Sequence, residues 1–268
     1  MIVIKIGGGA NIGEDVYTRF AKNIAAMNEQ VVIVHGGNAE FSALCEQLGL
    51  PVRKITSKSG RVSRYTDAET MDAMLMAYCG KVNKRAVADF RAEGVNAVGL
   101  SAIDGGIAVG KRKAEIRGTD IDGKMKVLRD DHAGSVNEFD PTLITTLMDA
   151  GYVVLVSPPG YSEGGVPINF DGDKLAQGLA EAMNADALLF FSDTPGLLQD
   201  RYEESSLIEH VDVANPEAAL AAAADRMVVK VEQAIKAVEA GVKQVIFADA
   251  RIESPVSAAL EGKGTVIA

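Results

Sequence analysis

Lys5 is the first residue of this chain whose type and position could carry out chemistry. It lies in an otherwise apolar run, Ile2–Ile6, that leads directly into Gly7 and Gly8. Burying an ammonium group costs free energy unless an anion lies against it, and glycines after a strand allow backbone N–H groups to approach that anion closely. The pattern therefore predicts a phosphate-binding strand end. A lysine that reaches water from the end of the strand is the alternative.

Two further turns carry groups that could bind anions. His35-Gly36-Gly37 ends a second apolar run, and glycines at such a turn place backbone donors at the positive end of the next helix. Arg64 precedes a predicted helix that Asp67 is placed to cap, and its guanidinium could bind a carboxylate through two parallel hydrogen bonds. We interpret both turns as candidate carboxylate or phosphate sites. Glycines required for a tight turn, and an ordinary surface arginine, are the alternatives.

The second half of the chain has three segments with charges near helix starts or strand ends. The run 169–173 (Asn-Phe-Asp-Gly-Asp) opens a helix and could position lysines or bind a metal, although it lacks the later ligands of a calcium loop. Capping of that helix by Asp171 is the simpler alternative. The run 193–197 follows an apolar strand, where open α/β sheets bind ligands. Lys230 lies on a predicted helix, where a lone lysine is usually solvated.

Composition limits the classes of protein that this chain could be. Its 268 residues, 47% of them apolar, suffice for one large domain or two closely joined lobes. The net charge of −10 argues against a general nucleic-acid binder. We see neither a membrane span of about 18 apolar residues nor a signal peptide, and Cys45 and Cys79 have no metal-ligand or disulfide spacing. We therefore expect a cytoplasmic protein that binds no membrane.

Apolar runs alternate with helical patterns along the chain. This alternation predicts an α/β fold, a three-layer αβα sandwich with a mostly parallel central sheet. The expected strands are 2–6, 31–35, 97–100, 153–157, 187–192, 244–248 and 265–268. The expected helices are 14–27, 39–48, 68–91, 141–150, 173–183 and 227–240. A loop rich in glycine at 162–165 suggests two lobes, 1–161 and 162–268, that share one continuous sheet.

The region 108–129 departs from this alternation and is rich in basic residues. Short polar runs flank 120–123 (Asp-Ile-Asp-Gly), which predicts a hairpin turn. Basic residues gathered on an acidic protein are typical of a surface that steers an acidic partner, with a solvated hairpin as the alternative. These residues are Lys111, Arg112, Lys113, Arg117, Lys124, Lys126 and Arg129.

Taken together and in this order, the segments resemble the amino acid kinase family over essentially the whole chain. Each motif alone is weak, but the ordered set is specific. The motifs are Lys5 with Gly7 and Gly8, His35-Gly36-Gly37, Arg64 before a helix, Gly80-Lys81-Val82-Asn83-Lys84, Val98-Gly99-Leu100, Asn169 with Asp173, Ser192-Asp193 with Gly196-Leu197, and Met227 with Lys230. Within the family the chain is most similar to the acetylglutamate kinase branch. Segments 59–70 and 169–173 look like the subgroup that acts on aminoadipate or glutamate attached to the carrier protein LysW.

The resemblance implies a transfer of phosphate from ATP, with Mg²⁺, to a side-chain carboxylate, which yields an acyl phosphate on the way to lysine or arginine. It implies that Lys5 and Lys230 neutralise charge on the transferring phosphoryl group and that Asp173 holds both lysines. The residues implied to bind the acyl substrate are Gly36, Gly37, Arg64 and Asn169. The residues implied to lie against the nucleotide are Gly7, Gly8, Asp193, Gly196 and Leu197. A carboxylate is already ionised at pH 7, so the absence of an obvious catalytic histidine fits this chemistry.

LysW-type carriers are acidic, which fits the basic region better than a free small substrate does. We assign Lys111, Arg112, Lys113 and Arg117 to carrier binding and expect a homodimer. An acetylglutamate kinase that acts on free substrate is the main alternative, and a non-catalytic amino-acid sensor on the same fold is a second.

The chain departs from the family at one position of the glycine-rich turn. Asn38 stands where the family usually has a third glycine. Asparagine tolerates the left-handed conformation better than most residues. It nevertheless adds a side chain beside the expected acyl substrate.

Overall fold

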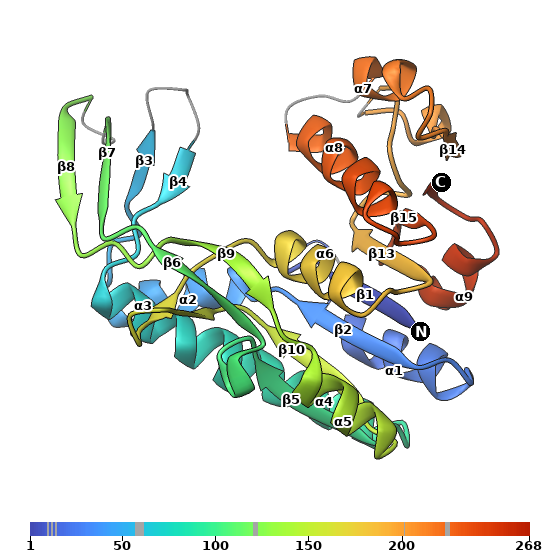
Figure 1. Ribbon diagram of the computed structural model, residues 1–268, viewed down its shortest axis with the longest axis horizontal. Coiled ribbons are helices and arrows are strands. Elements are labelled where there is room, and N and C mark those ends of the chain that lie inside the picture. The colour runs from blue at the N-terminus through green and yellow to red at the C-terminus, as the bar shows by residue number, and fades with distance from the viewer. Residues whose placement is uncertain are drawn as a thin grey trace.

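The computed structural model describes the chain except for Ala10, Ile12, Glu14, residues 57–61, residues 120–122, Arg201 and residues 223–225. Its centre is an eight-stranded sheet in the order β14-β16-β15-β13-β1-β2-β10-β5 (Figure 1). Every neighbouring pair is parallel except β15 and β16. The expected mostly parallel central sheet is therefore confirmed.

The strands of the central sheet agree closely with the apolar runs of the sequence, except the two-residue strand at 210–211, which was not predicted. They are β1 (Ile2–Ile6), β2 (Val31–His35), β5 (Ala97–Ser101), β10 (Val153–Ser157), β13 (Ala187–Ser192), β14 (His210–Val211), β15 (Val245–Asp249) and β16 (Thr265–Ile267). One face is covered by α1 (Val16–Ala25), α4 (Asn83–Ala92) and α9 (Pro255–Leu260). The other is covered by α5 (Thr142–Asp149), α6 (Gly172–Ala182) and α8 (Arg226–Glu239). The three-layer αβα arrangement is thus confirmed.

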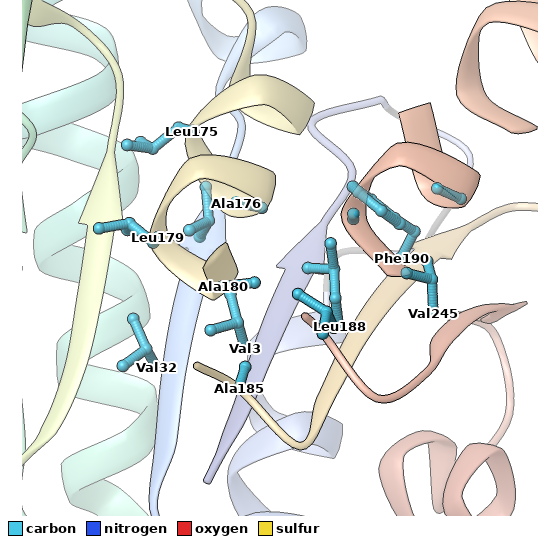
Figure 2. Close-up of a cluster of buried hydrophobic side chains, with 14 of the residues drawn as sticks. Val3, Val32, Leu175, Ala176, Leu179, Ala180, Ala185, Leu188, Phe190 and Val245 are labelled. Atoms are coloured by element: carbon cyan, nitrogen blue, oxygen red, sulfur yellow. The ribbon is translucent and has the colours of Figure 1, made fainter. Parts of the chain in front are cut away.

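Successive residues of β1 enter different cores, as expected for a strand buried on both faces. Ile2, Ile4 and Ile6 pack toward α1, α4 and α9. Val3 packs toward α6 with Leu179 and Ala180 (Figure 2). Lys5 follows Val3 by two residues, so the pleat directs its side chain to the same face, where α6 begins.

The long helix predicted over 68–91 consists of three consecutive segments. These are α3 (Ala68–Met74), a π-helical segment η2 (Leu75–Val82) and α4. Asp67 caps α3 by accepting a hydrogen bond from Thr70 N at 3.0 Å, as predicted. A third apolar cluster joins α3 and η2 to α2 (Asn38–Leu48). In the described part of the chain, no helix is both long and apolar enough to cross a membrane.

Two smaller sheets stand beside the central one. The first, in the order β12-β11-β6-β9, contains β6 (Ala108–Arg112), β9 (Gly134–Phe139), β11 (Gly160–Ser162) and β12 (Pro167–Ile168). The second, in the order β4-β3-β7-β8, contains β3 (Lys54–Thr56), β4 (Val62–Arg64), β7 (Glu115–Thr119) and β8 (Met125–Arg129). The second sheet and the pair α7 (Glu217–Ala222) and α8 lie on opposite sides of α6 (Figure 1).

The basic region is divided between these two sheets, which corrects one expectation. The pairing of β7 with β8 confirms the predicted hairpin, although its turn residues 120–122 lie outside the described part of the chain. Lys111 and Arg112, however, belong to β6, which pairs with β9 and not with the hairpin. The chain leaves β6 at Lys113, whose N–H donates to Ala133 O at 2.8 Å, before β7 begins. The seven basic residues therefore do not lie on one hairpin.

The predicted boundary between the two lobes falls within β11. The neighbouring strand β12 pairs antiparallel with β11 across that position, and β1 lies between β2 and β13 in the central sheet. One sheet thus joins segments from both halves of the chain. The division into two lobes stays a prediction.

The packing of α6 against β9 generates a test of the fold. A Cβ atom at Gly178 of α6 would lie 2.2 Å from the ring of Phe139. We expect Gly178→Ala to lower the free energy of unfolding by about 1–3 kcal/mol, because the added methyl group overpacks this contact. Urea unfolding measures the change.

Gly80→Ala is the matched control for this test. The nearest atom to a Cβ at Gly80 is the Leu75 carbonyl oxygen, 4.0 Å away. We expect no loss of stability, and up to about 1 kcal/mol of gain from the stiffer unfolded chain. Equal stabilities of the two variants would contradict the packing of α6 described here.

Candidate active site

The glycine turns after β1 and β2 pack directly against each other at the carboxyl end of the sheet. A Cβ atom at Gly8 would lie 2.6 Å from Gly37 N, and one at Gly36 would lie 2.9 Å from Gly8 N. Only glycine permits this approach of two backbones. The N–H of Ala39 also donates to Gly8 O at 3.1 Å. The two turns therefore form one surface, at the edge where α/β sheets bind ligands.

A mostly buried ion triad lies beside this surface. Asp173, in the first turn of α6, receives Lys5 Nζ at 2.5 Å on Oδ1 and Lys230 Nζ at 3.6 Å on Oδ2. The side chains of Lys5 and Asp173 are 14% and 15% exposed, and that of Lys230 is 31% exposed. The structure thus brings together three residues that are far apart in the sequence.

The charges of the triad do not cancel. Burial alone would raise the pKa of Asp173, but the ammonium groups of Lys5 and then Lys230 outweigh it and hold that pKa below its usual range. Two cations and one carboxylate leave one surplus positive charge. The Asp171 carboxylate accepts from Asp173 N at 2.8 Å and caps α6, as its simpler interpretation predicted. A positive triad at a helix N-terminus favours an anion such as a phosphoryl group.

Arg64 ends β4, and the first turn of α2 holds its guanidinium. Arg64 Nη2 donates to Asn38 Oδ1 at 2.6 Å, and the guanidinium carbon lies 4.4 Å from the centre of the Phe41 ring. Arg64 Nε is buried and has no hydrogen-bond partner in the part of the chain that the structure describes. The guanidinium of Arg64 is therefore oriented on one edge by Asn38 and Phe41, and its Nε is left without a partner among the described residues.

The same contact explains Asn38, which replaces the family's usual glycine. Asn38 is the first residue of α2, in helical conformation, so the left-handed geometry invoked from the sequence is not required there. Its side chain is engaged by Arg64. The extra side chain thus fixes an arginine and does not simply narrow the turn.

Asn169 is held from both sides of its backbone. Its N–H donates to His132 O at 2.7 Å, and its carbonyl accepts from Gly134 N at 2.9 Å. Its side-chain Nδ2 donates to Thr66 Oγ1 at 3.1 Å. Thr66 follows Arg64 by two residues, so Asn169 and the Arg64 segment are connected directly.

The sequence matches the amino acid kinase family over residues 1–249. The chain belongs to this family. Two curated relatives align along its whole length. The LysW-aminoadipate kinase of Deinococcus radiodurans is 45% identical over 267 residues, which cover 100% of this chain and 91% of that protein. The acetylglutamate kinase of Methanopyrus kandleri is 36% identical over 270 residues, which cover 100% of both chains.

Solved structures extend the likeness to the fold. The N-acetylglutamate synthase from Neisseria gonorrhoeae, complexed with coenzyme A and N-acetyl-glutamate, matches with a TM-score of 0.78 at 23% identity. The match covers 100% of this chain and 59% of that chain. At this identity the comparison shows only that the amino acid kinase fold is shared.

The residues predicted to lie against the nucleotide are placed around the ends of β1 and β13. Gly7 N donates to Phe191 O at 3.1 Å, and Asn11 Nδ2 donates to Asp193 Oδ2 at 3.0 Å, so the loops after the two strands are joined. A Cβ at Gly196 would lie 2.6 Å from Thr265 Oγ1. Leu197 is buried in the core. Leu197 therefore lies beneath the surface formed by these loops, and its contact with a nucleotide stays a prediction.

The residues predicted to bind a carrier differ in their availability. Lys111 and Lys113 are exposed. Arg112 is half-buried, pairs with Asp130 and donates Nε to Asp131 O at 2.9 Å. Arg117 is exposed but lies 2.7 Å from the Glu115 carboxylate. Arg112 therefore helps to build the base of this region and is less available to a partner than the lysines.

Sequence reasoning missed His35 as a support of the glycine turn. His35 is fully buried, with Nδ1 2.9 Å from Gly36 O and Nε2 2.9 Å from Asn83 Nδ2. Because Gly36 O can only accept, Nδ1 carries the proton and Nε2 accepts from the amide. The neutral ring thereby holds the Gly36 carbonyl. Burial lowers the pKa of His35 to about 4, which keeps the ring neutral at physiological pH.

The depressed pKa of His35 generates a test of stability against pH. The unfolded histidine binds a proton below about pH 6.5, whereas the folded one does so only near its lowered pKa. Stability should therefore fall as the pH falls from about 6.5 toward 4, by about 3 kcal/mol in all. Urea unfolding over this range measures it. His35→Gln should reduce the slope by the His35 contribution and leave only that of carboxylates such as Asp173, whose pKa values are lowered, while the exposed control His210→Gln should keep the full slope. An unchanged slope in His35→Gln would contradict the assignment.

Proposed function

We propose that this kinase transfers the γ-phosphoryl group of ATP to the side-chain carboxylate of aminoadipate, or of glutamate, linked to an acidic LysW-type carrier protein. The observation that carries the phosphoryl chemistry is the surplus positive charge of Lys5, Asp173 and Lys230 beside the glycine turns. The choice of substrate is supported by the 45% identity to a LysW-aminoadipate kinase along the whole chain. The product would be an acyl phosphate on the carrier.

The proposed reaction needs no general base. A substrate carboxylate oxygen attacks the γ-phosphorus, and the bond to the bridging oxygen of ADP breaks, so no proton has to move. Lys5 and Lys230 would neutralise the phosphoryl oxygens as charge redistributes. Asp173 would keep both ammonium groups in place, as its contacts to them suggest.

The acyl substrate would lie over the first half of the chain, 1–161. Gly37 would offer its backbone N–H at the start of α2, whereas Gly36 N already donates to Ile6 O at 3.2 Å and would support the turn. Arg64, whose half-buried guanidinium is held in place by Asn38 and Phe41, would bind a substrate carboxylate. Asn169 would hold the acyl chain through the side-chain oxygen that Thr66 does not engage.

The nucleotide would lie over the second half, 162–268, with Asp193, Gly196 and Leu197 at its base and Gly7 and Gly8 at its phosphates. Magnesium would supply charge neutralisation on those phosphates. The described residues contain no group of three or more His, Cys, Asp or Glu side chains that could hold a metal, and Asp173 is already paired with two lysines. This donor set fits an ion held mainly by phosphate and water.

The carrier would approach through the exposed cations at the C-terminal end of β6 and on β7. Lys111, Lys113 and Arg117 would attract its acidic surface, with Arg112 holding the base of β6. We place the enzyme in the cytoplasm as a homodimer. Leu48 of α2 and Met76 of η2, on elements that pack together, are 53% and 57% exposed and suit an apolar dimer contact.

Trapping the acyl phosphate tests the proposed function. The enzyme is supplied with ATP, Mg²⁺ and hydroxylamine, together with LysW carrier bearing aminoadipate, carrier bearing glutamate, or free N-acetylglutamate. We expect hydroxamate on a carrier-linked substrate, seen as a mass increase of the intact carrier. Hydroxamate from free N-acetylglutamate alone would establish the acetylglutamate kinase alternative. Hydroxamate from none of the three would favour a non-catalytic sensor.

The ion triad generates a prediction on rate. Lys5→Ala and Lys230→Ala should each lower kcat by about 10²–10³, because each removes a preorganised positive charge from the transferring group. Steady-state kinetics on the accepted substrate measures kcat, and circular dichroism checks the fold. A folded variant with nearly wild-type turnover would contradict the proposed role of that lysine in phosphoryl transfer.

The basic region generates a prediction on association. Reversing charge at Lys111 and Lys113 should slow association with the carrier at low salt, and the effect should shrink toward roughly 1 M salt, where the Debye length is about 3 Å. Lys22→Glu with Lys263→Glu, two other exposed lysines, is the matched control and should leave association nearly unchanged. Stopped-flow association measures both. Equal association rates for the two double variants at low salt would contradict a role of the basic region in carrier binding.

A further inference from the structure

The segment that connects β8 to β9 lies between the two parts of the candidate acyl site. Residues 130–133 follow β8 and precede β9, and we refer to them as the connector. In the connector, His132 N donates to Thr66 O at 2.6 Å, and His132 O accepts from Asn169 N at 2.7 Å. The connector therefore contacts both the segment that follows Arg64 and the residue that precedes α6.

Asp131 is the centre of the connector. Its side chain is fully buried, and Oδ1 accepts from Thr66 N at 3.0 Å and from Ala133 N at 3.2 Å. Its main-chain carbonyl accepts from Arg112 Nε at 2.9 Å. One residue thus binds the Arg64 segment through its side chain and the base of β6 through its backbone.

The carboxylate of Asp131 is retained at a cost. Burial raises its pKa, and Oδ2 is buried without a hydrogen-bond partner in the described part of the chain. Arg112, whose Nε donates to the Asp131 carbonyl at 2.9 Å, brings a cation close to this carboxylate. A buried carboxylate with one unengaged oxygen is destabilising. Because stability does not account for such a group, its geometry points to a role in function.

We propose that Asp131 is a positioning residue that fixes Thr66, and through Thr66 the side chain of Asn169, in the geometry that binds the acyl substrate. This inference rests on the proposed function. Thr66 receives three restraints: Asp131 on its N–H, His132 on its carbonyl and Asn169 on its hydroxyl. The first is charge-assisted and therefore the strongest. Through Arg112 the same residue ties the acyl site to the region assigned to the carrier.

Asp131→Asn is the decisive variant because it keeps the shape and removes the charge. The weaker hydrogen bond to Thr66 N should loosen Asn169, so KM for the acyl substrate should rise about tenfold while KM for ATP changes less than about twofold. Affinity for the carrier without its amino acid should stay unchanged, because Lys111 and Lys113 are untouched. Unfolding free energy should stay equal or rise, because the buried charge is gone.

Asp140→Asn is the matched control. Asp140 also accepts from a residue close in sequence, through Thr142 N at 2.9 Å, but it is bonded to neither Thr66 nor Asn169. It should leave both KM values unchanged. If Asp131→Asn fails to fold, Thr66→Val replaces it, since it deletes only the hydroxyl that binds Asn169 and should raise the same KM.

Each result separates this inference from the proposed function. Turnover by the wild-type enzyme shows which acyl substrate is accepted. The KM values of Asp131→Asn and the wild type are then compared on that substrate. An unchanged KM for that substrate would overturn the positioning role. Equal increases of both KM values would also overturn it, because they would mark a general loss of structure.

Discussion

The ion triad of Lys5, Asp173 and Lys230 is the interaction on which the rest of this structure depends. Each member comes from a different element, β1, α6 or α8, and those elements meet only because the central sheet places β1 under α6. An isolated lysine in a buried strand would be costly, and an isolated Asp173 equally so. Together they are tolerated and retain one positive charge. That surplus charge lies beside the packed glycine turns, and the proposed phosphoryl transfer depends on it.

A second constraint is that the residues proposed to bind the acyl substrate are linked to one another and to β6 by hydrogen bonds. The first turn of α2 holds Arg64 through Asn38 and Phe41. The connector then links Thr66 and Asn169 to the base of β6. The region proposed for the carrier and the region proposed for its amino acid are thus joined by hydrogen bonds and do not form independent surfaces. A substrate carried on a protein would benefit from such a link, because docking and positioning must occur together.

The sequence predicted the central fold well and the surrounding pieces poorly. Long apolar strands and amphipathic helices have strong periodic signals, so β1, β2 and β10 were located to the residue. The strands β3, β4 and β9 are short or polar, and β3 pairs with β7 and β9 with β6, which are separated from them along the chain by other strands. The three residues of the triad were predicted from the order of the family motifs, but the distances between their charged groups could not be predicted. Asp131 gave no signal, because a buried aspartate in a polar loop cannot be told from a solvated one by sequence.

The proposed role of Asp173 can be tested most directly by rapid-quench measurement of a single turnover in Asp173→Asn with the accepted acyl substrate. The account predicts a phosphoryl-transfer rate constant lower by about 10² or more, because the lysines lose the charge that holds them in place. The variant should remain folded by circular dichroism. A rate constant within about threefold of the wild type would contradict the account, because such a change is only about 0.6 kcal/mol in the barrier and the triad would then be a structural ion pair.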